Sequence, residues 1–197
     1  MTLLGIDTES GGITTDYDLL TLTLSIVENY EIVSTLDLKV KPDPVDSRTE
    51  FFVQGEALRV NGIDLGKHDL EAIPYRDSKR IIFNWLSESK EKYGKLLPFG
   101  NGIKRDIELI TKYTISQKAW DMNTVRNPIE LTTLGNNFKM LGIIPREQSL
   151  SLSNMAKYFG VEVNDELAHT AYYDVWLGTQ VLKGYNSLIQ GVRYEKI

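Results

Sequence analysis

The sequence has no cysteine, and histidine is almost as scarce, with two residues in a chain of 197. Without cysteine the chain forms no disulfide and offers no thiolate ligand to zinc, so a reducing compartment is its natural setting. No apolar run approaches the ~20 residues that a membrane span needs, and the N-terminus lacks a basic segment followed by an apolar one. We therefore predict a soluble, cytoplasmic protein that does not act at a membrane.

Internal repeats, low-complexity segments and blocks of like charge are also missing, and no segment has the composition of a linker. Hydrophobic residues make up 42% of the chain, which is enough to bury one substantial core at this length. We predict a single domain that covers residues 1–197.

Positive charge is in deficit, because 22 Lys and Arg residues face 27 Asp and Glu residues, for a net charge of −5. Proteins that hold long nucleic acids by their phosphates usually present a basic surface, so this balance argues at first against such a role. If four of the carboxylates are metal ligands, the rest of the chain is nearly neutral and two divalent ions more than neutralise the four. The composition is therefore compatible with a substrate that is held through metal ions.

The first elements that the sequence predicts are strands. Residues 2–9 form an apolar run, and residues 19–27 and 31–40 alternate apolar with polar side chains, as half-buried strands do. A tight turn joins the second and third strands, and prolines at 42 and 44 end the third. Short helices are expected within 45–75, a helix over 78–93, a buried strand over 95–99 and helices beyond it. This order predicts an α/β protein with a mixed sheet.

Asp7 and Glu9 stand two residues apart at the end of the first strand. Residues i and i+2 of a strand point to one face, so the two carboxylates project together. They repel unless a proton, a basic side chain or a divalent metal lies between them. Taken alone, the pair is explained equally well by a solvated strand end.

Two further segments carry candidate groups. Asp106 lies just past GNG, at the end of a predicted strand, where ligand-binding residues collect in open α/β sheets, although an acid is also favourable at a helix N-terminus. In HTAYYD, His169 and Asp174 are separated by about 140° on a regular helix. They share a site only if His169 precedes the helix or begins it.

The motifs DTE, GNGIKRD and HTAYYD together resemble those of the DnaQ-like, DEDDh family of 3′→5′ exonucleases, which includes polymerase proofreading subunits, oligoribonuclease and ribonuclease T. The resemblance spans nearly the whole chain and implies a ribonuclease H-like fold, with a mixed five-stranded sheet flanked by helices. It implies that Asp7, Glu9 and Asp174 hold one Mg²⁺ or Mn²⁺ ion and that Asp7 bridges to a second ion supported by Asp106. His169 is then the general base, since histidine accepts a proton near neutral pH.

The activity that the resemblance implies is removal of nucleoside 5′-monophosphates from the 3′ end of single-stranded nucleic acid. DNA is the favoured substrate, with a DNA polymerase or another replication or repair protein as partner, and RNA is the alternative. A ribonuclease H-type endonuclease and a non-catalytic nucleic-acid or protein interaction module on the same fold are the rival interpretations.

Substrate contacts are predicted from position along the chain. Ser10, Gly11, Gly12 and Ile13 follow the acids, and the glycines allow a strand end to approach the backbone closely. Asn61, in ALRVNGID, and Asn101 are further predicted contacts, although a helix with a glycine cap explains ALRVNGID equally well.

The chain departs from the family in its second motif and beyond it. Family members often have a His-Asn pair and an aromatic residue in the second motif, where this chain has Asn101, Gly102 and Arg105. A common Asp-Thr pair is replaced by Glu130 and Leu131. We expect Arg105 to solvate its helix rather than meet a phosphate, and His68 to lie at the surface.

Overall fold

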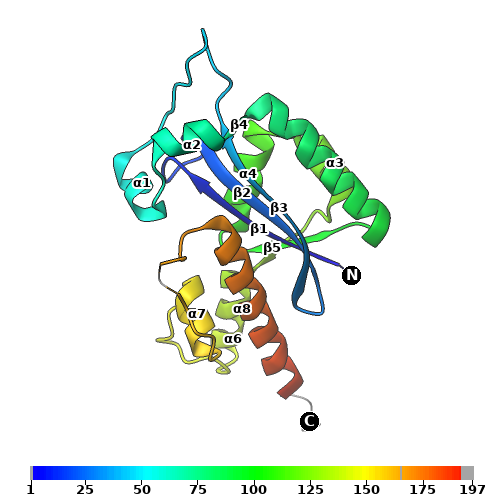
Figure 1. Cartoon of the computed structure of the whole chain (residues 1–197). Coiled ribbons are helices and arrows are strands. Elements are labelled where there is room, and N and C mark those ends of the chain that lie inside the picture. Colours follow the sequence, from blue (N-terminus) through cyan, green and yellow to red (C-terminus); the bar gives the residue numbers. More distant parts are fainter. Residues whose placement is uncertain (1, 165, 192–197) are drawn as a thin grey trace.

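The structure is a computed structural model that describes residues 2–164 and 166–191. A six-stranded sheet in the order β4-β3-β2-β1-β5-β6 lies at its centre, with helices on both faces (Figure 1). Strands β1 (Leu3–Ser10), β2 (Leu19–Glu28) and β3 (Glu31–Lys41) form the predicted antiparallel meander. Because β5 (Leu97–Gly100) runs parallel to β1, the sheet is mixed, as predicted.

Two very short strands lie at the edges of this sheet. β4 (Ile73–Pro74) pairs with the end of β3, and β6 (Ile129–Glu130) pairs with β5, both in parallel. The sheet thus has one strand more than the resemblance implies. A strand of two residues is too short to show an alternating pattern, so sequence periodicity does not reveal it.

Helices occupy most of the remaining chain. The longer ones are α3 (Tyr75–Tyr93), α4 (Ile103–Tyr113), α6 (Leu131–Met140) and α8 (Ala171–Gly191), and the shorter ones are α1 (Gly55–Asn61), α2 (Leu65–Glu71), α5 (Gln117–Asn123) and α7 (Leu152–Tyr158). Within the described ranges, none of these helices has the length and apolar character required to cross a membrane.

The sheet separates two hydrophobic cores. Helices α3 and α4 cover one face, where Leu4 and Ile6 of β1 are buried, and α8 packs on the other face together with α6 and α7. Side chains of a strand alternate between faces, so Gly5, Asp7 and Glu9 lie on the side of α8. Leu4 and Ile6 of β1 thus join one core, whereas Asp7 and Glu9 face the side on which α8 lies.

Gly5 determines how closely α8 approaches β1. A Cβ atom at Gly5 would lie 2.7 Å from Cγ1 of Val175 and 3.1 Å from the ring of Phe99, so a larger residue would force a shift. Val175 follows Asp174 directly in the chain. The missing side chain at Gly5 thus allows α8 to bring Asp174 to the end of β1.

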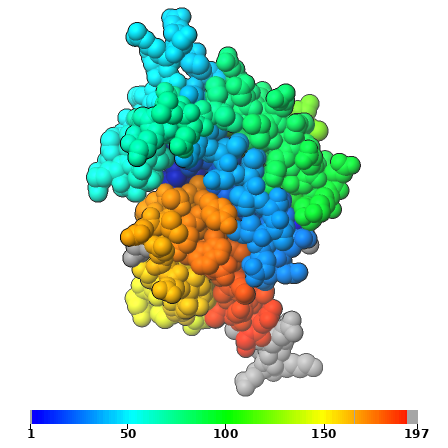
Figure 2. All heavy atoms as spheres, viewed as in Figure 1, coloured from blue at the N-terminus to red at the C-terminus, as the bar shows by residue number. Residues whose placement is uncertain are grey.

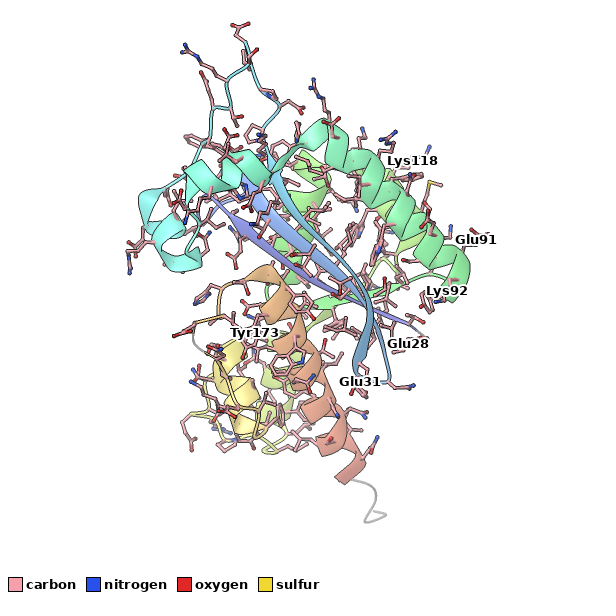
Figure 3. All side chains as sticks on the ribbon, in the orientation of Figure 1. Glu28, Glu31, Glu91, Lys92, Lys118 and Tyr173 are labelled. Carbon is pink, nitrogen blue, oxygen red and sulfur yellow. The ribbon has the colours of Figure 1, made fainter. Side chains whose placement is uncertain are left out.

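The β2–β3 turn lies at the opposite end of the sheet from Asp7 and Glu9. Asn29 and Tyr30 form it with φ angles of 52° and 63°, the left-handed conformation that a two-residue hairpin turn requires. The charged side chains of Glu28 and Glu31, and those at the end of α3, gather at this far end (Figure 3). They are therefore remote from the candidate site.

Candidate active site

The carboxylates predicted from the sequence meet where β1 ends. Asp7 and Glu9 of β1 and Asp174, in the first turn of α8, each contribute a carboxylate oxygen to a group of atoms that lie within 4.8 Å of one another. All three side chains are half-buried. In Figure 2, β1 (dark blue) lies deep in a hollow between the cyan segment of α1 and α2 and the orange start of α8.

Asp106 approaches the same place from α4. Its side chain is buried, and its Oδ1 accepts a hydrogen bond of 2.6 Å from the hydroxyl of Thr8. Its Oδ2 is buried without a hydrogen-bond partner among the described residues. A buried carboxylate oxygen is costly in this state unless water or an ion binds it. Asp106 thus has one oxygen held by the fold and one available to a ligand.

Burial and mutual repulsion raise the pKa of the clustered carboxyl groups. Burial raises the pKa of Glu9 to about 8 and that of Asp106 to about 7. The pKa of Asp7 lies well above its usual range, because of burial first and then the negative charges of Asp106, Glu9 and Asp174. Burial also raises the pKa of Asp174. A proton or a bound cation offsets the cost of holding these negative charges together in a buried place.

His169 lies just before α8, as the spacing to Asp174 requires if the two share a site. Its φ angle is 67°, in the left-handed region, and the helix begins two residues later at Ala171. The side chain is exposed, and its charge lowers the pKa of Asp174. His169 therefore precedes the helix, close enough to Asp174 to affect its pKa, and lines one cavity together with Glu9.

The loop before His169 is tied to α8 itself. The backbone N–H of Asn164 donates a hydrogen bond of 2.7 Å to the hydroxyl of Tyr173, which points from α8 toward this loop (Figure 3). The hydroxyl of Thr170 donates to the carbonyl of Leu167 at 2.8 Å. These contacts fix the path of the chain on both sides of His169.

Two cavities meet at Glu9 and Asn61. The first has a volume of about 420 Å³ and is also lined by Ser10, Gly12, Ile13, Val60 and Arg105. The second has a volume of about 460 Å³, begins at His169 and Tyr172 and crosses β2 and β3 toward Lys39 and Lys67. The cluster thus lies between two spaces, one beside the turn after β1 and one running along the sheet.

Most, but not all, of the predicted substrate contacts line the first cavity. Ser10, Gly12, Ile13 and Asn61 lie there, whereas Asn101 accepts a hydrogen bond of 2.9 Å from the hydroxyl of Thr132 and lines neither cavity. Gly11 is packed so closely that a Cβ atom would lie 2.4 Å from Val53. Its role in the fold is to let the turn pass the 50s loop.

The helix that contains Asn61 has the predicted glycine cap. α1 ends at Asn61, and Gly62 follows with a φ angle of 66°. The glycine cap, offered as an alternative to a substrate contact, is therefore confirmed. Since Asn61 also lines both cavities, the two explanations do not exclude each other.

Two expectations about single side chains are wrong. His68 is buried, with 4% of its surface exposed, and its Nε2 lies 2.9 Å from the carbonyl oxygen of Val40, because α2 packs beside β3. Arg105 does not simply solvate its helix, since it is partly buried and donates hydrogen bonds to the turn after β1. Both side chains bond to residues that are distant in the sequence, which local patterns do not reveal.

Glu130 has a role that the sequence did not indicate. Its carboxylate accepts hydrogen bonds from the backbone N–H groups of Gly102 and Ile103, at 3.1 and 3.0 Å, and so caps the start of α4 from a neighbouring strand. It also accepts one from Thr132 at 3.2 Å. The residue that departs from the family's Asp-Thr pair thus joins the first turns of α4 and α6.

No model of a protein family matches this chain, and no curated protein sequence does. Among solved structures, the zinc-bound complex of E. coli exonuclease I with single-stranded DNA has a TM-score of 0.71 at 17% identity, covering 97% of this chain and 41% of its own. Exonuclease X in complex with 5′ overhanging duplex DNA has a TM-score of 0.59 at 14% identity, covering 98% and 93%. The nuclease domain of 3′hExo, a DEDDh family member bound to rAMP, has a TM-score of 0.58 at 12% identity, covering 100% and 96%.

These likenesses show the fold. The chain has the mixed sheet and flanking helices of the ribonuclease H-like exonucleases, as the resemblance of its motifs implies. It spans about 41% of the exonuclease I chain and nearly matches the other two in extent.

Proposed function

We propose that this protein is a metal-dependent 3′→5′ exonuclease that removes nucleoside 5′-monophosphates from the 3′ end of single-stranded nucleic acid. The observation that carries the proposal is the convergence of Asp7, Glu9 and Asp174 within 4.8 Å, with the buried Asp106 beside them. The fold, shared with solved exonucleases, supports it.

The donor set fits two Mg²⁺ or Mn²⁺ ions. All its donors are carboxylate oxygens, which hard divalent ions prefer, whereas zinc favours nitrogen and sulfur ligands. Such a cation would favour the ionised form of Asp7, whose pKa is raised. It would also give the Oδ2 of Asp106 the partner that it lacks among the described residues. Asp7, Glu9 and Asp174 would hold one ion, and Asp7 with Asp106 a second. When bound, the ions supply an activated water and stabilise charge on the phosphate.

The side chains of the chain itself hold the substrate and accept the proton. His169, exposed beside the cluster, would act as the general base for the attacking water. The turn from Ser10 to Ile13 and Asn61 would receive the terminal nucleotide in the 420 Å³ cavity. The Ile13 side chain is 83% exposed there and offers an apolar surface to a base.

Single-stranded DNA is the proposed substrate, with RNA as the alternative. The similar exonuclease I structure contains single-stranded DNA and the similar 3′hExo domain contains rAMP, so a DNA strand and a ribonucleotide both occur with this fold. A net charge of −5 gives a weak grip on long strands, which favours a DNA polymerase or another replication or repair protein as the partner that delivers the 3′ end.

The test uses 5′-labelled single-stranded DNA and RNA of one sequence, incubated with Mg²⁺, with Mn²⁺ and with chelator. Wild-type protein is compared with Asp7→Ala and His169→Ala, and circular dichroism confirms that both variants fold. We expect a metal-dependent ladder that shortens from the 3′ end and is lost in both variants. The faster polymer identifies the substrate.

Other results contradict the proposal in distinct ways. Internal fragments in place of a 3′ ladder indicate an endonuclease on the same fold. Absence of cleavage by the wild type, with and without a polymerase, indicates a binding module. Full activity of Asp7→Ala shows that the site is elsewhere.

A further inference from the structure

Arg105 connects α4 to the turn that follows Glu9. Its Nε donates a hydrogen bond of 3.0 Å to the carbonyl of Ile13, and its Nη2 donates to the hydroxyl of Ser10 and the carbonyl of Gly12, each at 2.5 Å. One guanidinium thus holds three successive parts of the turn. A fork of N–H donors in a fixed plane is specific to arginine, because a lysine ammonium is a single point donor.

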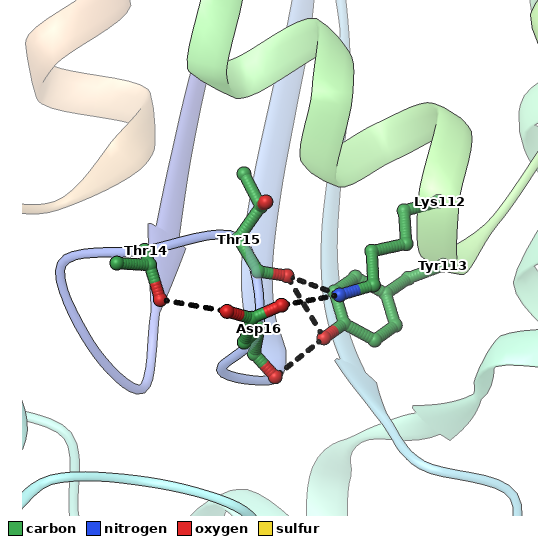
Figure 4. A network of polar contacts seen from close by, with 5 residues as sticks. All are labelled: Thr14, Thr15, Asp16, Lys112 and Tyr113. Carbon is green, nitrogen blue, oxygen red and sulfur yellow. Dashed lines mark hydrogen bonds and ion pairs between the residues drawn. The ribbon is translucent and has the colours of Figure 1, made fainter.

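The rest of the same loop is tied to the other end of α4. Lys112 donates to the carbonyl of Thr15 at 2.6 Å and forms an ion pair of 3.5 Å with Asp16 (Figure 4). The hydroxyl of Tyr113 donates to the carbonyl of Asp16 at 3.0 Å. The loop therefore lies along α4, with Arg105 near the start of the helix and Lys112 and Tyr113 at its end.

Of these contacts between the loop and α4, the hydrogen bonds of Arg105 are the ones at the candidate site. It lines the 420 Å³ cavity together with Glu9, Gly12 and Ile13. The exposed Ile13 side chain has little packing to hold it, so the position of its backbone, to which Arg105 donates, decides where it lies. The positive charge of Arg105 also lowers the pKa of Asp7, Glu9 and Asp106.

We propose that Arg105 is a positioning residue that locks the Ser10–Ile13 turn in the shape that receives the 3′-terminal nucleotide. The inference rests on the proposed function for the identity of the ligand, and on the three hydrogen bonds for the lock itself. This chain thus shapes the pocket with a guanidinium fork at the position where the resemblance leads one to expect an aromatic side chain.

A purely electrostatic role makes a different prediction. If only its charge mattered, Arg105→Lys would retain the function, because lysine is also cationic. If the fork matters, Arg105→Lys and Arg105→Gln both release the turn. Lys104→Gln is the matched control, since Lys104 precedes Arg105 on the same helix turn but is 89% exposed and lies near Glu108 at 3.9 Å.

The experiment makes two measurements on the wild type and these three variants. Hydrogen–deuterium exchange follows the amides of residues 10–18, without metal or nucleic acid. Calorimetry at saturating Mn²⁺ gives the dissociation constant for thymidine 5′-monophosphate, and steady-state digestion of single-stranded DNA gives KM and kcat. We expect faster exchange in both Arg105 variants, and a dissociation constant and KM raised by about tenfold or more, as the loss of hydrogen bonds to a charged group implies. The change in kcat should be smaller, and Lys104→Gln should resemble wild type.

The outcomes separate this inference from the proposed function. An active wild type with an Arg105→Lys variant that matches it in exchange, dissociation constant and KM overturns the positioning role. A wild type that neither cleaves DNA nor binds the monophosphate overturns the proposed function and the nucleotide part of the inference. In that case the exchange of residues 10–18 still decides whether Arg105 holds the turn. If Arg105→Gln fails to fold, Arg105→Lys carries the comparison.

Discussion

At the scale of the residue, the feature that distinguishes this site is the crowding of negative charge around Asp7. Its carboxylate is close to those of Glu9 and Asp174, and the negative charge of Asp106 also raises its pKa. The fold tolerates this arrangement although it raises the pKa of Asp7, which means that the ionised form is disfavoured by the folded protein. The site therefore reduces stability when no cation is present, which is the usual behaviour of a binding site.

Removing the charge at Asp7 should separate stability from function. We expect Asp7→Asn to stabilise the metal-free protein, because it removes a negative charge that burial and the neighbouring carboxylates disfavour. The same change should weaken Mn²⁺ binding and abolish metal-induced stabilisation. Urea unfolding with and without Mn²⁺ tests both effects. A metal-free variant less stable than wild type would contradict this account of the cluster.

The stability of the metal-free protein should fall as pH rises. Burial raises the pKa of Glu9 from its usual 4.5 to about 8, so between these values the folded state retains a proton that the unfolded state releases. The contribution of the protonated group is complete below pH 4.5 and is lost as pH rises through about 8. Unfolding in chelator across this range measures the decline.

Glu9→Gln is the control for this pH dependence, because glutamine does not titrate. The variant should show a shallower decline in unfolding free energy than wild type, and saturating Mg²⁺ should remove most of the difference at the alkaline end. A steeper decline in the variant would show that another group is responsible.

At the scale of the element, the closeness of α8 to β1 decides whether the site assembles. Gly5→Ala places a methyl group 2.7 Å from Val175 and should destabilise the protein by about 1–3 kcal/mol, as overpacking does. Because Asp174 adjoins Val175, metal affinity should fall as well. Thermal unfolding and Mn²⁺ titration measure the two effects.

A second substitution tests the cause. Val175→Ala removes Cγ1, the atom that would lie 2.7 Å from the new methyl group of Gly5→Ala. The variant that carries both substitutions should therefore regain part of the lost metal affinity. Gly55→Ala is the matched control, since nothing lies within 4 Å of the Cβ atom it would add. Equal loss of metal affinity in Gly5→Ala and Gly55→Ala would rule out the close approach as the reason.

The elements also show what the sequence allows one to predict. The alternation along β1 predicted that Asp7 and Glu9 lie on one face, which is confirmed. The spacing in HTAYYD required His169 to precede the helix or begin it if it shares a site with Asp174, and His169 does precede α8. The bonds of Arg105 and Glu130 were not predicted, since each joins segments far apart in the sequence. Local periodicity determines where a side chain points, and only the packing of elements determines what it meets.

At the scale of the whole molecule, the acidic balance limits how the chain grips a polymer, because its net charge is −5. We expect digestion of long single strands to be distributive, with every intermediate length visible while most of the substrate is intact. A trap of unlabelled strands, added after the reaction starts, should therefore stop it at once.

The dependence on salt should be shallow for the same reason. With a net charge of −5, we expect lysine and arginine to hold few phosphates, so the rate at limiting substrate should fall by less than about tenfold between about 50 and 200 mM salt. A polymerase partner that delivers the 3′ end should lengthen each encounter. Processive digestion by the isolated protein, or a steep salt dependence, would reveal a basic track outside the two cavities.

The order in which the carboxylates occur along the chain has a consequence for synthesis. Asp7 and Glu9 leave the ribosome well before His169 and Asp174. Until α8 docks against Gly5, the nascent chain carries Asp7, Glu9 and Asp106 without Asp174. A chain interrupted before residue 169 therefore retains the whole β-meander and yet lacks the group proposed as general base. Under the proposed mechanism, such an incomplete chain would be unable to cleave nucleic acid.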